Sequence, residues 1–583
     1  MISINKFDEF CVKNKNYILI VLLILNFIIT STSVVNESVT YDEVCYAGTG
    51  TYILKTGDYS TLPSIGHAVL PLHINSIFLN FLDIDKKVWK KDCWDRGPEV
   101  IFNSGYDFRL ITFLIRLPFM LISLLLAFYV YKWSTELYGL KAGFLSLFLY
   151  LFNPVIISTS RLALTDLAAA TFFLIATYYF WRFNKKPSLK NLFLTGLFIG
   201  LTFLTKEIAV FLIPTYVILI MLNYKKISIK KSMSSLLLIG IITFLLIFLA
   251  YGFQIGPIAS SVPTHYKDRA IKEINNKFSN NIELRDQILY IFHNVSVPAP
   301  AYIASNFFTA YHSDKGIKGY FFGEISEVGQ KWWYYYPVLV FIKTPIPTII
   351  LFLLSLLYFR KIKGVVIFNE LHLIIPFLIN FLFFMFNQQA HSVRQIIVIF
   401  PYLFIFTGKI VNIKVRNKKT LSILLLVLLI WNLLSVILAY PAYTTYFNEF
   451  VGGPKNGHKY LLSDNLDIGQ DLIRLKNFMD RNNIDKINLS YYGGIDPIYY
   501  RVYYDAMPTA CFVIHANQYY EPFAANCQKK YFEDCRVRTG IVAISATNLH
   551  NRFLKNTSCF NWLKNYEPID RLGNSIFVYN ITS

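Results

Sequence analysis

The chain has 583 residues, of which 54% are hydrophobic, 17% aromatic and only 16% charged, and its formal net charge is +20. These values exclude an ordinary soluble enzyme and predict a protein that crosses a membrane several times. The basic residues lie in short loops between apolar runs, without an interleaved aromatic groove, so we expect no nucleic acid as a partner.

Eleven apolar runs have lengths suited to helices in a bilayer, and they predict a polytopic α-helical membrane protein with about eleven transmembrane helices. The runs are about Tyr17–Ser33, Leu110–Tyr131, Gly143–Ile157, Leu162–Trp181, Leu192–Leu204, Ile208–Asn223, Ser235–Phe253, Trp333–Phe359, Val365–Phe386, Gln395–Ile413 and Leu421–Tyr440. The two runs beside Thr205-Lys206-Glu207 are short for a hydrocarbon core of roughly 30 Å, so one bent hairpin is the alternative there.

Lys and Arg cluster at every second connection between the runs, which indicates loops on the cytoplasmic side. The N-terminus is therefore predicted to be cytoplasmic, and residues 34–109, residues 254–331 and the tail from Pro441 are predicted to be exterior. We expect a transmembrane domain over residues 1–440 and a small exterior α/β domain over residues 441–583.

Asp42 and Glu43 directly follow the first apolar run. A carboxylate that faces a watery cavity can accept a proton from a bound hydroxyl, whereas one that faces lipid is expensive to desolvate. We interpret this acidic pair as a candidate catalytic site, and a solvated loop turn is the alternative.

Six of the seven cysteines fall on the predicted exterior side, two in the first loop and four in the tail. These even numbers permit disulfides, and a bond between Cys45 and Cys93 would tie the acidic pair to the end of its loop. Spacing does not establish the connectivity, and reduced cysteines are the alternative. Both long exterior loops mix apolar and charged residues, which favours amphipathic helices on a membrane surface over ordinary loop packing.

Charged residues recur at the predicted outer ends of later spans. They are Arg161, Asp166, Lys206, Glu207, Lys343 and Arg394. Cations at a membrane interface need partners, and a lipid phosphate explains why separate helices contribute several of them. Structural ion pairs, such as Arg161 with Asp166 or Lys206 with Glu207, are the competing interpretation.

The tail pattern predicts a helix over Asp471–Asn482 and strands over Lys486–Tyr491, Ile541–Ile544 and Ser575–Asn580. A polar cluster precedes the helix and consists of Asp464, Asp467, Gln470 and Asp471. We interpret this cluster as helix capping before Leu472.

The order of the motifs resembles the glycosyltransferase-C superfamily, specifically the protein O-mannosyltransferases and lipid A aminoarabinose transferases. The motifs are Tyr41-Asp42-Glu43, Arg116-Leu-Pro118, Arg161 to Asp166, Leu204-Thr-Lys206, Trp332-Trp333, Ile342-Lys-Thr-Pro345, Arg394 before Phe400-Pro401, Tyr446-Phe-Asn-Glu449, Gly452-Gly-Pro-Lys-Asn-Gly457 and the segment from Ser463 to Leu472. The resemblance spans nearly the whole chain.

The resemblance implies an inverting transfer of a sugar from a polyprenyl-phosphate donor to an acceptor hydroxyl on the exterior face. Asp42 would be the general base, and Glu43 or Asp166 would orient it or tune its pKa. The donor phosphate would be bound by Lys206 and Arg394, with Lys343 and Arg161 as further candidates.

The implied partners are the lipid donor, the bilayer and an acceptor that is a protein, a glycolipid or a polysaccharide, with a hexose as the expected sugar. A divalent metal stays open, and no other cofactor is expected. We expect an integral protein of a prokaryotic plasma membrane. A polyprenyl-linked lipid flippase or transporter, which would use the same cations, is the alternative, and a lipid-modifying phosphotransferase is a second one.

Overall fold

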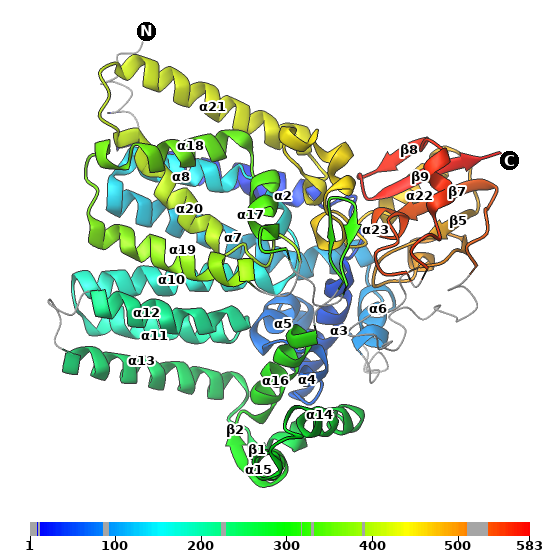
Figure 1. Ribbon diagram of the computed structural model, residues 1–583, viewed down its shortest axis with the longest axis horizontal. Coiled ribbons are helices and arrows are strands. Elements are labelled where there is room, and N and C mark those ends of the chain that lie inside the picture. Colours follow the sequence, from blue (N-terminus) through cyan, green and yellow to red (C-terminus); the bar gives the residue numbers. More distant parts are fainter. Residues whose placement is uncertain are drawn as a thin grey trace.

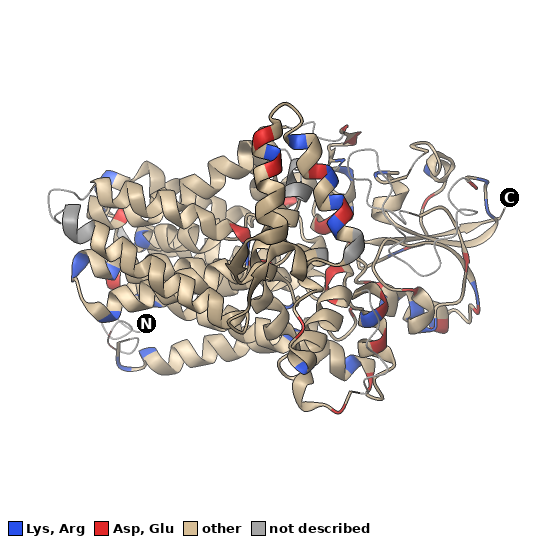
Figure 2. Cartoon of the chain, turned by 90° about the horizontal axis from the view of Figure 1, so that it is seen from below, with Lys and Arg blue, Asp and Glu red and all other residues tan. Residues whose placement is uncertain are grey.

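The computed structural model describes residues 9, 12–84, 93–222, 229–315, 318–327, 332–386, 391–509, 534–554 and 556–582. Long helices run side by side in one bundle, and shorter helices and a β-sheet gather at one end of it (Figure 1). The charged residues lie at one end of the bundle and, beyond its other end, over the shorter helices and the sheet, and the ribbon of the bundle between these regions is almost free of them (Figure 2). This distribution is typical of a protein whose middle lies in hydrocarbon.

Each apolar run contains a helix. The helices of the bundle are α2 (Lys15–Ser33), α7 (Phe108–Tyr138), α8 (Leu140–Leu151), α9 (Pro154–Ser160), α10 (Thr165–Lys185), α11 (Leu189–Phe203), α12 (Leu212–Leu222), α13 (Ile229–Ala250), α17 (Tyr335–Lys343), α18 (Ile346–Leu357), α19 (Ile367–Phe386), α20 (Ile399–Gly408) and α21 (Lys418–Ala439). Among the described residues, five helices are long and apolar enough to cross a membrane, or up to seven if each bent pair is one span. The membrane class is thus confirmed, and the number of eleven crossings stays a prediction.

Two of the predicted spans are broken rather than straight. The axes of α8 and α9 differ by 64°, and those of α17 and α18 by 116°. At the first break, Asn153 caps α9 by accepting hydrogen bonds from the N–H groups of Val155 and Ile156. At the second, Pro345 has no N–H to continue a helix. These local features explain why the two apolar runs bend.

Helix α13 shows most directly that the bundle needs lipid. Only 6% of its most apolar window is buried inside the protein, compared with 56% for α7. Leu237, Phe244, Leu245 and Leu249 are all exposed along it. Such a continuous apolar face is stable in a bilayer and aggregates in water.

The first exterior segment folds into α3 (Tyr41–Thr56), α4 (Leu62–Ile65), α5 (Val69–Ser76) and α6 (Cys93–Phe102). A disulfide joins Cys45 to Cys93, which settles the connectivity that spacing left open. The backbones of α3 and α6 touch, because a Cβ on Gly97 would lie 2.1 Å from the carbonyl oxygen of Val44. The acidic pair is therefore held on a rigid helix rather than in a loop.

The second exterior segment contains the expected helices, although their position on a membrane surface stays a prediction. It comprises β1 (Ile255–Pro257), α14 (Thr264–Lys277), α15 (Ile282–Asn294), β2 (Ser296–Pro298), α16 (Pro300–Lys315), β3 (Tyr320–Phe321) and β4 (Glu324–Ile325). Strand β1 pairs with β2, and β3 pairs with β4, both antiparallel.

The predicted helix and strands of the tail are confirmed. They are α22 (Leu472–Arg481), β5 (Ile487–Ser490), β7 (Gly540–Ser545) and β9 (Ile576–Ile581), to which the structure adds β6 (Tyr504–Ala506), α23 (Ala546–Leu549) and β8 (Asp570–Leu572). The sheet has the order β6-β5-β7-β9-β8, with β5 parallel to β6 and β7, and β9 antiparallel to β7 and β8.

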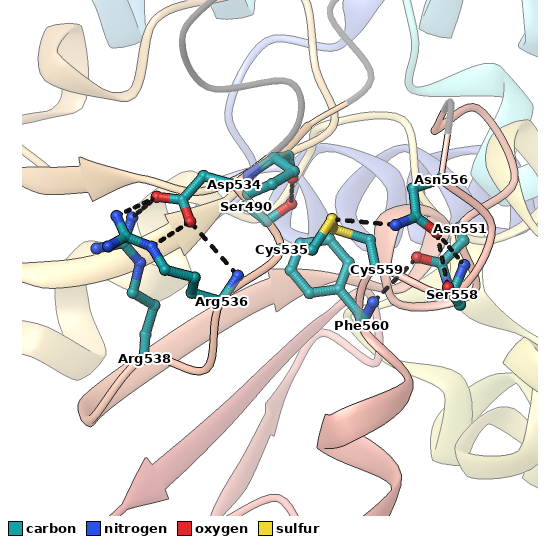
Figure 3. Close-up of a disulfide and its surroundings, with 11 residues drawn as sticks. Ser490, Asp534, Cys535, Arg536, Arg538, Asn551, Asn556, Ser558, Cys559 and Phe560 are labelled. Atoms are coloured by element: carbon teal, nitrogen blue, oxygen red, sulfur yellow. Dashed lines mark hydrogen bonds and ion pairs between the residues drawn. A yellow bond between two sulfur atoms is a disulfide. The ribbon is translucent and has the colours of Figure 1, made fainter.

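The tail sheet and the bundle share apolar core residues. One buried cluster joins Ile115 and Phe119 of α7 to Leu472 of α22 and Leu489 of β5. A domain boundary at 440/441 therefore stays a prediction. The disulfide between Cys535 and Cys559 closes the tail, next to Asp534, which pairs with Arg536 and Arg538 (Figure 3). Cys511 and Cys527 lie outside the described residues.

Candidate active site

Asp42 lies in the first turn of α3, and its position follows from how that helix begins. Thr40 is the N-cap, and its backbone N–H donates to Oε2 of Glu43 at 2.9 Å, as in a capping box. Asp42, between them, retains 27% exposure and contacts Nη2 of Arg394 at 2.8 Å through Oδ2. A carboxylate that is both partly exposed and held by a cation is suited to accept a proton from a bound group.

Glu43 points to a different partner from its neighbour Asp42. Its carboxylate is fully buried and accepts from Arg116 twice, Nε to Oε1 at 2.9 Å and Nη2 to Oε2 at 2.7 Å. The N–H of Ala163 also donates to Oε1 at 2.8 Å. Burial by itself raises the pKa of Glu43, but the Arg116 guanidinium outweighs it and holds the pKa below the usual range. Glu43 therefore joins α3, α7 and the start of α10.

Asp166 and Lys206 form a buried ion pair, with 2.6 Å between Oδ1 and Nζ. Asp166 lies in the first turn of α10, and Lys206 lies in the bend between α11 and the 3₁₀ helix η3 (Glu207–Phe211). This pairing differs from both ion pairs that the sequence suggested, because Arg161 bonds elsewhere. An amine held by one carboxylate keeps its charge, which an anionic ligand can recruit.

Arg394 connects two carboxylates that are far apart in the sequence. Its Nη2 lies 2.8 Å from Oδ2 of Asp42 and 2.5 Å from Oδ2 of Asp464. Asp166 is also near enough to act electrostatically on Arg394, and Arg394 on Lys206. These five residues, Asp42, Asp166, Lys206, Arg394 and Asp464, are hereafter the charged cluster. It combines three carboxylates with two cationic side chains.

Lys343 and Arg161, two of the predicted phosphate ligands, bond to other groups of the protein in this structure. Lys343 Nζ donates to the carbonyl oxygens of Thr444 at 3.0 Å, Tyr446 at 2.8 Å and Asn465 at 2.5 Å, which uses all three of its hydrogens. It lines the same small cavity as Arg394, but its donors face the tail loop.

Arg161 is buried at the junction of the bundle and the tail. It pairs with Glu37 at 2.9 Å and donates to the carbonyl oxygen of Pro441 at 2.8 Å and to Thr444 Oγ1 at 3.2 Å. Both Lys343 and Arg161 thus hold the tail against the helices in this structure.

Helix capping accounts for less of the tail cluster than the sequence suggested. Asp471 occupies the N-cap of α22, yet its side chain makes no capping bond and instead pairs with Arg474 and accepts from Ser575. Asp464 belongs to the charged cluster. The capping interpretation is wrong for these two residues, because long-range partners compete for their carboxylates.

Sequence reasoning also missed His67 and Tyr46, which border the charged cluster. Their rings meet edge to face with centroids 5.3 Å apart. Burial lowers the pKa of His67, although the nearby acids Glu207 and Asp42 act in the opposite direction. His67 lies between α4 and α5 in the first exterior segment, where it offered no periodic signal.

Asp467 carries a pH dependence of its own. Burial raises its pKa to about 7, and its Oδ2 accepts from the N–H of Thr547 at 3.2 Å. The folded protein therefore binds more protons than the unfolded chain between about pH 4 and pH 7, so stability falls as pH rises through that window. The full shift corresponds to about 4 kcal/mol, at about 1.4 kcal/mol per pKa unit.

We expect Asp467→Asn to flatten this dependence, because an amide carries no charge to desolvate. The measurement is the melting temperature in detergent from pH 4 to pH 8 for both proteins. Parallel curves for the two proteins would contradict the assignment.

We assign no metal ligands in the part of the chain that the structure describes. Among the residues that the structure describes, no three His, Cys, Asp or Glu side chains are grouped as a metal ion requires. The divalent metal that the sequence left open stays open.

Comparison with protein families finds one match. Residues 110–251 match the family described as dolichyl-phosphate-mannose-protein mannosyltransferase. The segment runs from α7 to the end of α13 and includes Arg116, Asp166 and Lys206. It confirms the resemblance to the glycosyltransferase-C superfamily that the order of motifs indicated. No sequence among the curated proteins matches the chain.

Solved structures with a similar course include ArnT from Cupriavidus metallidurans bound to undecaprenyl phosphate, at 11% identity, a TM-score of 0.46 and coverage of 96% of this chain and 97% of that one. ArnT from the same organism in the apo state has 11% identity and a TM-score of 0.48, and the match covers 97% of this chain and 98% of that one. Oligosaccharyltransferase AglB from Archaeoglobus fulgidus has 15% identity and a TM-score of 0.42, and the match covers 73% of this chain and 56% of that one. At these values the likeness says nothing of the substrate of this chain.

Proposed function

We propose that this protein is an inverting glycosyltransferase that moves a sugar from a polyprenyl-phosphate donor to an acceptor hydroxyl. The observation that carries the proposal is the contact of a partly exposed Asp42 with Arg394, beside the Lys206–Asp166 pair at one end of an apolar bundle. A base and two cations at a membrane surface supply what attack on a lipid-phosphate-linked sugar requires.

In the proposed reaction, Asp42 accepts the proton of the acceptor hydroxyl as its oxygen attacks the anomeric carbon. The bond from that carbon to the phosphate oxygen breaks, and one direct displacement inverts the configuration. The electron pair of the broken bond stays on the phosphate, so negative charge grows there as the bond lengthens. Arg394 and Lys206 stabilise this charge, and Asp166 keeps the amine of Lys206 in place.

Glu43, Lys343 and Arg161 have supporting parts in this proposal. Glu43 holds the first turn of α3 through Arg116 and thereby fixes the direction of Asp42. Lys343 and Arg161 hold the tail loop against the bundle. We assign them to positioning because their polar atoms contact protein groups rather than the charged cluster.

The proposal includes eleven crossings in a prokaryotic plasma membrane, with a cytoplasmic N-terminus and an exterior C-terminal unit of α/β type. A donor hexose and an acceptor on a protein, a glycolipid or a polysaccharide complete it. The positions of Lys and Arg support this orientation, since they recur in the loops opposite the charged cluster.

The test is release of polyprenyl phosphate from polyprenyl-phosphate-hexose by the purified protein in nanodiscs, followed by mass spectrometry. Cell-envelope extract supplies the acceptor. Acceptor-dependent release is expected, because transfer frees the lipid phosphate. Donor binding without release, across several donor sugars, would contradict the enzyme and favour a flippase or transporter.

A further inference from the structure

The loop that carries Asp464 is attached to the segment around Arg394 by several hydrogen bonds. The N–H of Val393 donates to Oδ1 of Asn465 at 2.9 Å, and Nδ2 of Asn465 donates to the carbonyl oxygen of His391 at 3.2 Å. Lys343 adds a bond to the carbonyl oxygen of Asn465 at 2.5 Å. These hydrogen bonds attach the backbone of the tail loop to the segment that carries Arg394.

The backbone of this loop is held in a costly conformation. Ser463 has a φ of 54°, in the left-handed region that side-chain-bearing residues seldom adopt. Its Oγ lies 3.2 Å from Oδ1 of Asp464, and its N–H donates to Oγ1 of Thr547 at 3.3 Å. Strain of this kind persists where surrounding contacts impose it, and here it directs Asp464 toward Arg394.

Arg394 meets both of its acidic partners through one nitrogen. Nη2 contacts Oδ2 of Asp42 and Oδ2 of Asp464, and all three side chains are between 18% and 27% exposed. The cavity lined by Arg394, Asp464 and Lys343 encloses about 20 Å³, which is close to one water molecule. An incoming phosphate oxygen that binds Nη2 must therefore take the place of a carboxylate oxygen.

Asp464 is the carboxylate that can leave. Asp42 lies on α3, which the Cys45–Cys93 disulfide and the Glu43–Arg116 pair hold rigidly. Asp464 lies in the short 3₁₀ helix η10 (Ser463–Asn465), where release of a strained turn lets the side chain move. Exchange of one anion for another also keeps two anionic partners on the partly buried guanidinium of Arg394.

We propose that Asp464 is a positioning residue that holds Arg394 beside Asp42 until the phosphate group of the lipid donor replaces its carboxylate. The inference rests on the proposed function, because it assigns the phosphate site to Arg394. It makes the tail a part of the donor site rather than a separate acceptor module. A lipid phosphate is the ligand because the cations lie at the outer end of the bundle.

The experiment measures binding of undecaprenyl phosphate to the full-length protein in nanodiscs, together with turnover. In Asp464→Asn the competing charge is gone, so we expect tighter binding, by up to about fivefold, the upper end of the range for a partly exposed ion pair. We expect kcat to fall about tenfold or more, because Arg394 is less precisely placed. Asp464→Glu keeps the charge and should restore both values toward wild type.

The control is Asp467→Asn, which removes a buried carboxylate from the same loop without touching Arg394. It should shift the melting temperature and leave undecaprenyl phosphate binding unchanged. Unchanged or weaker binding by Asp464→Asn would overturn the inference. Tighter binding in a protein that transfers no sugar would support the exchange on Arg394 and contradict the glycosyltransferase reaction alone.

Discussion

Replacing Asp42 by Asn is expected to lower the rate of sugar transfer about 10²- to 10⁴-fold, the range for loss of a general base. The amide has nearly the shape of the carboxylate and still offers an oxygen to Arg394, so donor binding should not weaken. The measurement is the initial rate of polyprenyl phosphate release, with donor affinity and melting temperature determined on the same preparation. A rate near that of the wild type would remove Asp42 from the chemistry.

The matched control for this variant is Asp95→Asn, which removes an exposed carboxylate from the neighbouring helix α6. Both variants change the net charge of the first exterior segment by the same amount. Of these two residues, Asp42 contacts Arg394 and Asp95 is exposed on α6, so only the Asp42 variant should lose transfer. Equal losses would indicate an effect of overall charge on lipid binding instead of loss of a base.

Glu43→Gln changes the residue next to Asp42, but we expect it to lower the stability of the protein rather than its chemistry. The free energy of unfolding should fall by about 3–5 kcal/mol. The reason is that Arg116 would keep its charge in a fully buried place after losing the carboxylate with which it pairs. The measurement is the melting temperature in detergent, compared with Asp42→Asn, which should unfold near the wild-type temperature. The two adjacent acids thus predict opposite phenotypes.

A double variant tests the physical reason. Glu43→Gln combined with Arg116→Met removes both charges, so part of the lost stability should return. Additive losses would show that each side chain acts through separate contacts. A Glu43→Gln protein of normal stability without transfer activity would contradict the supporting role and place Glu43 at the substrate.

The candidate site was partly predictable from the sequence. Asp42, Asp166, Lys206 and Arg394 were selected because charged side chains at the ends of apolar runs are costly without a purpose, and the structure brings all four into the charged cluster. Arg161 and Lys343 met the same criterion, yet they bond to carbonyl groups and to Glu37. A cost of burial identifies a constrained residue, but it does not identify the partner.

Asp464 was left out of the predicted site, although it belongs to the charged cluster. It lies 70 residues beyond Arg394 in a polar stretch that looked like a helix cap. Capping is a local interaction and can be read from neighbouring residues, whereas its contact with Arg394 depends on how the tail docks on the bundle. The same holds for Glu43 and Arg116, which are 73 residues apart.

The amino-acid sequence alone was enough to predict the membrane class, the helix and strands of the tail and an acidic pair after the first apolar run. These properties follow from the transfer of each residue from water and from interactions within a few positions along the chain. The partners of Arg394, the cations that hold the tail and the bends in two apolar runs became apparent in the folded protein. Those contacts join segments that are distant in the sequence. Local patterns such as periodicity and capping do not reveal which distant segments pack together.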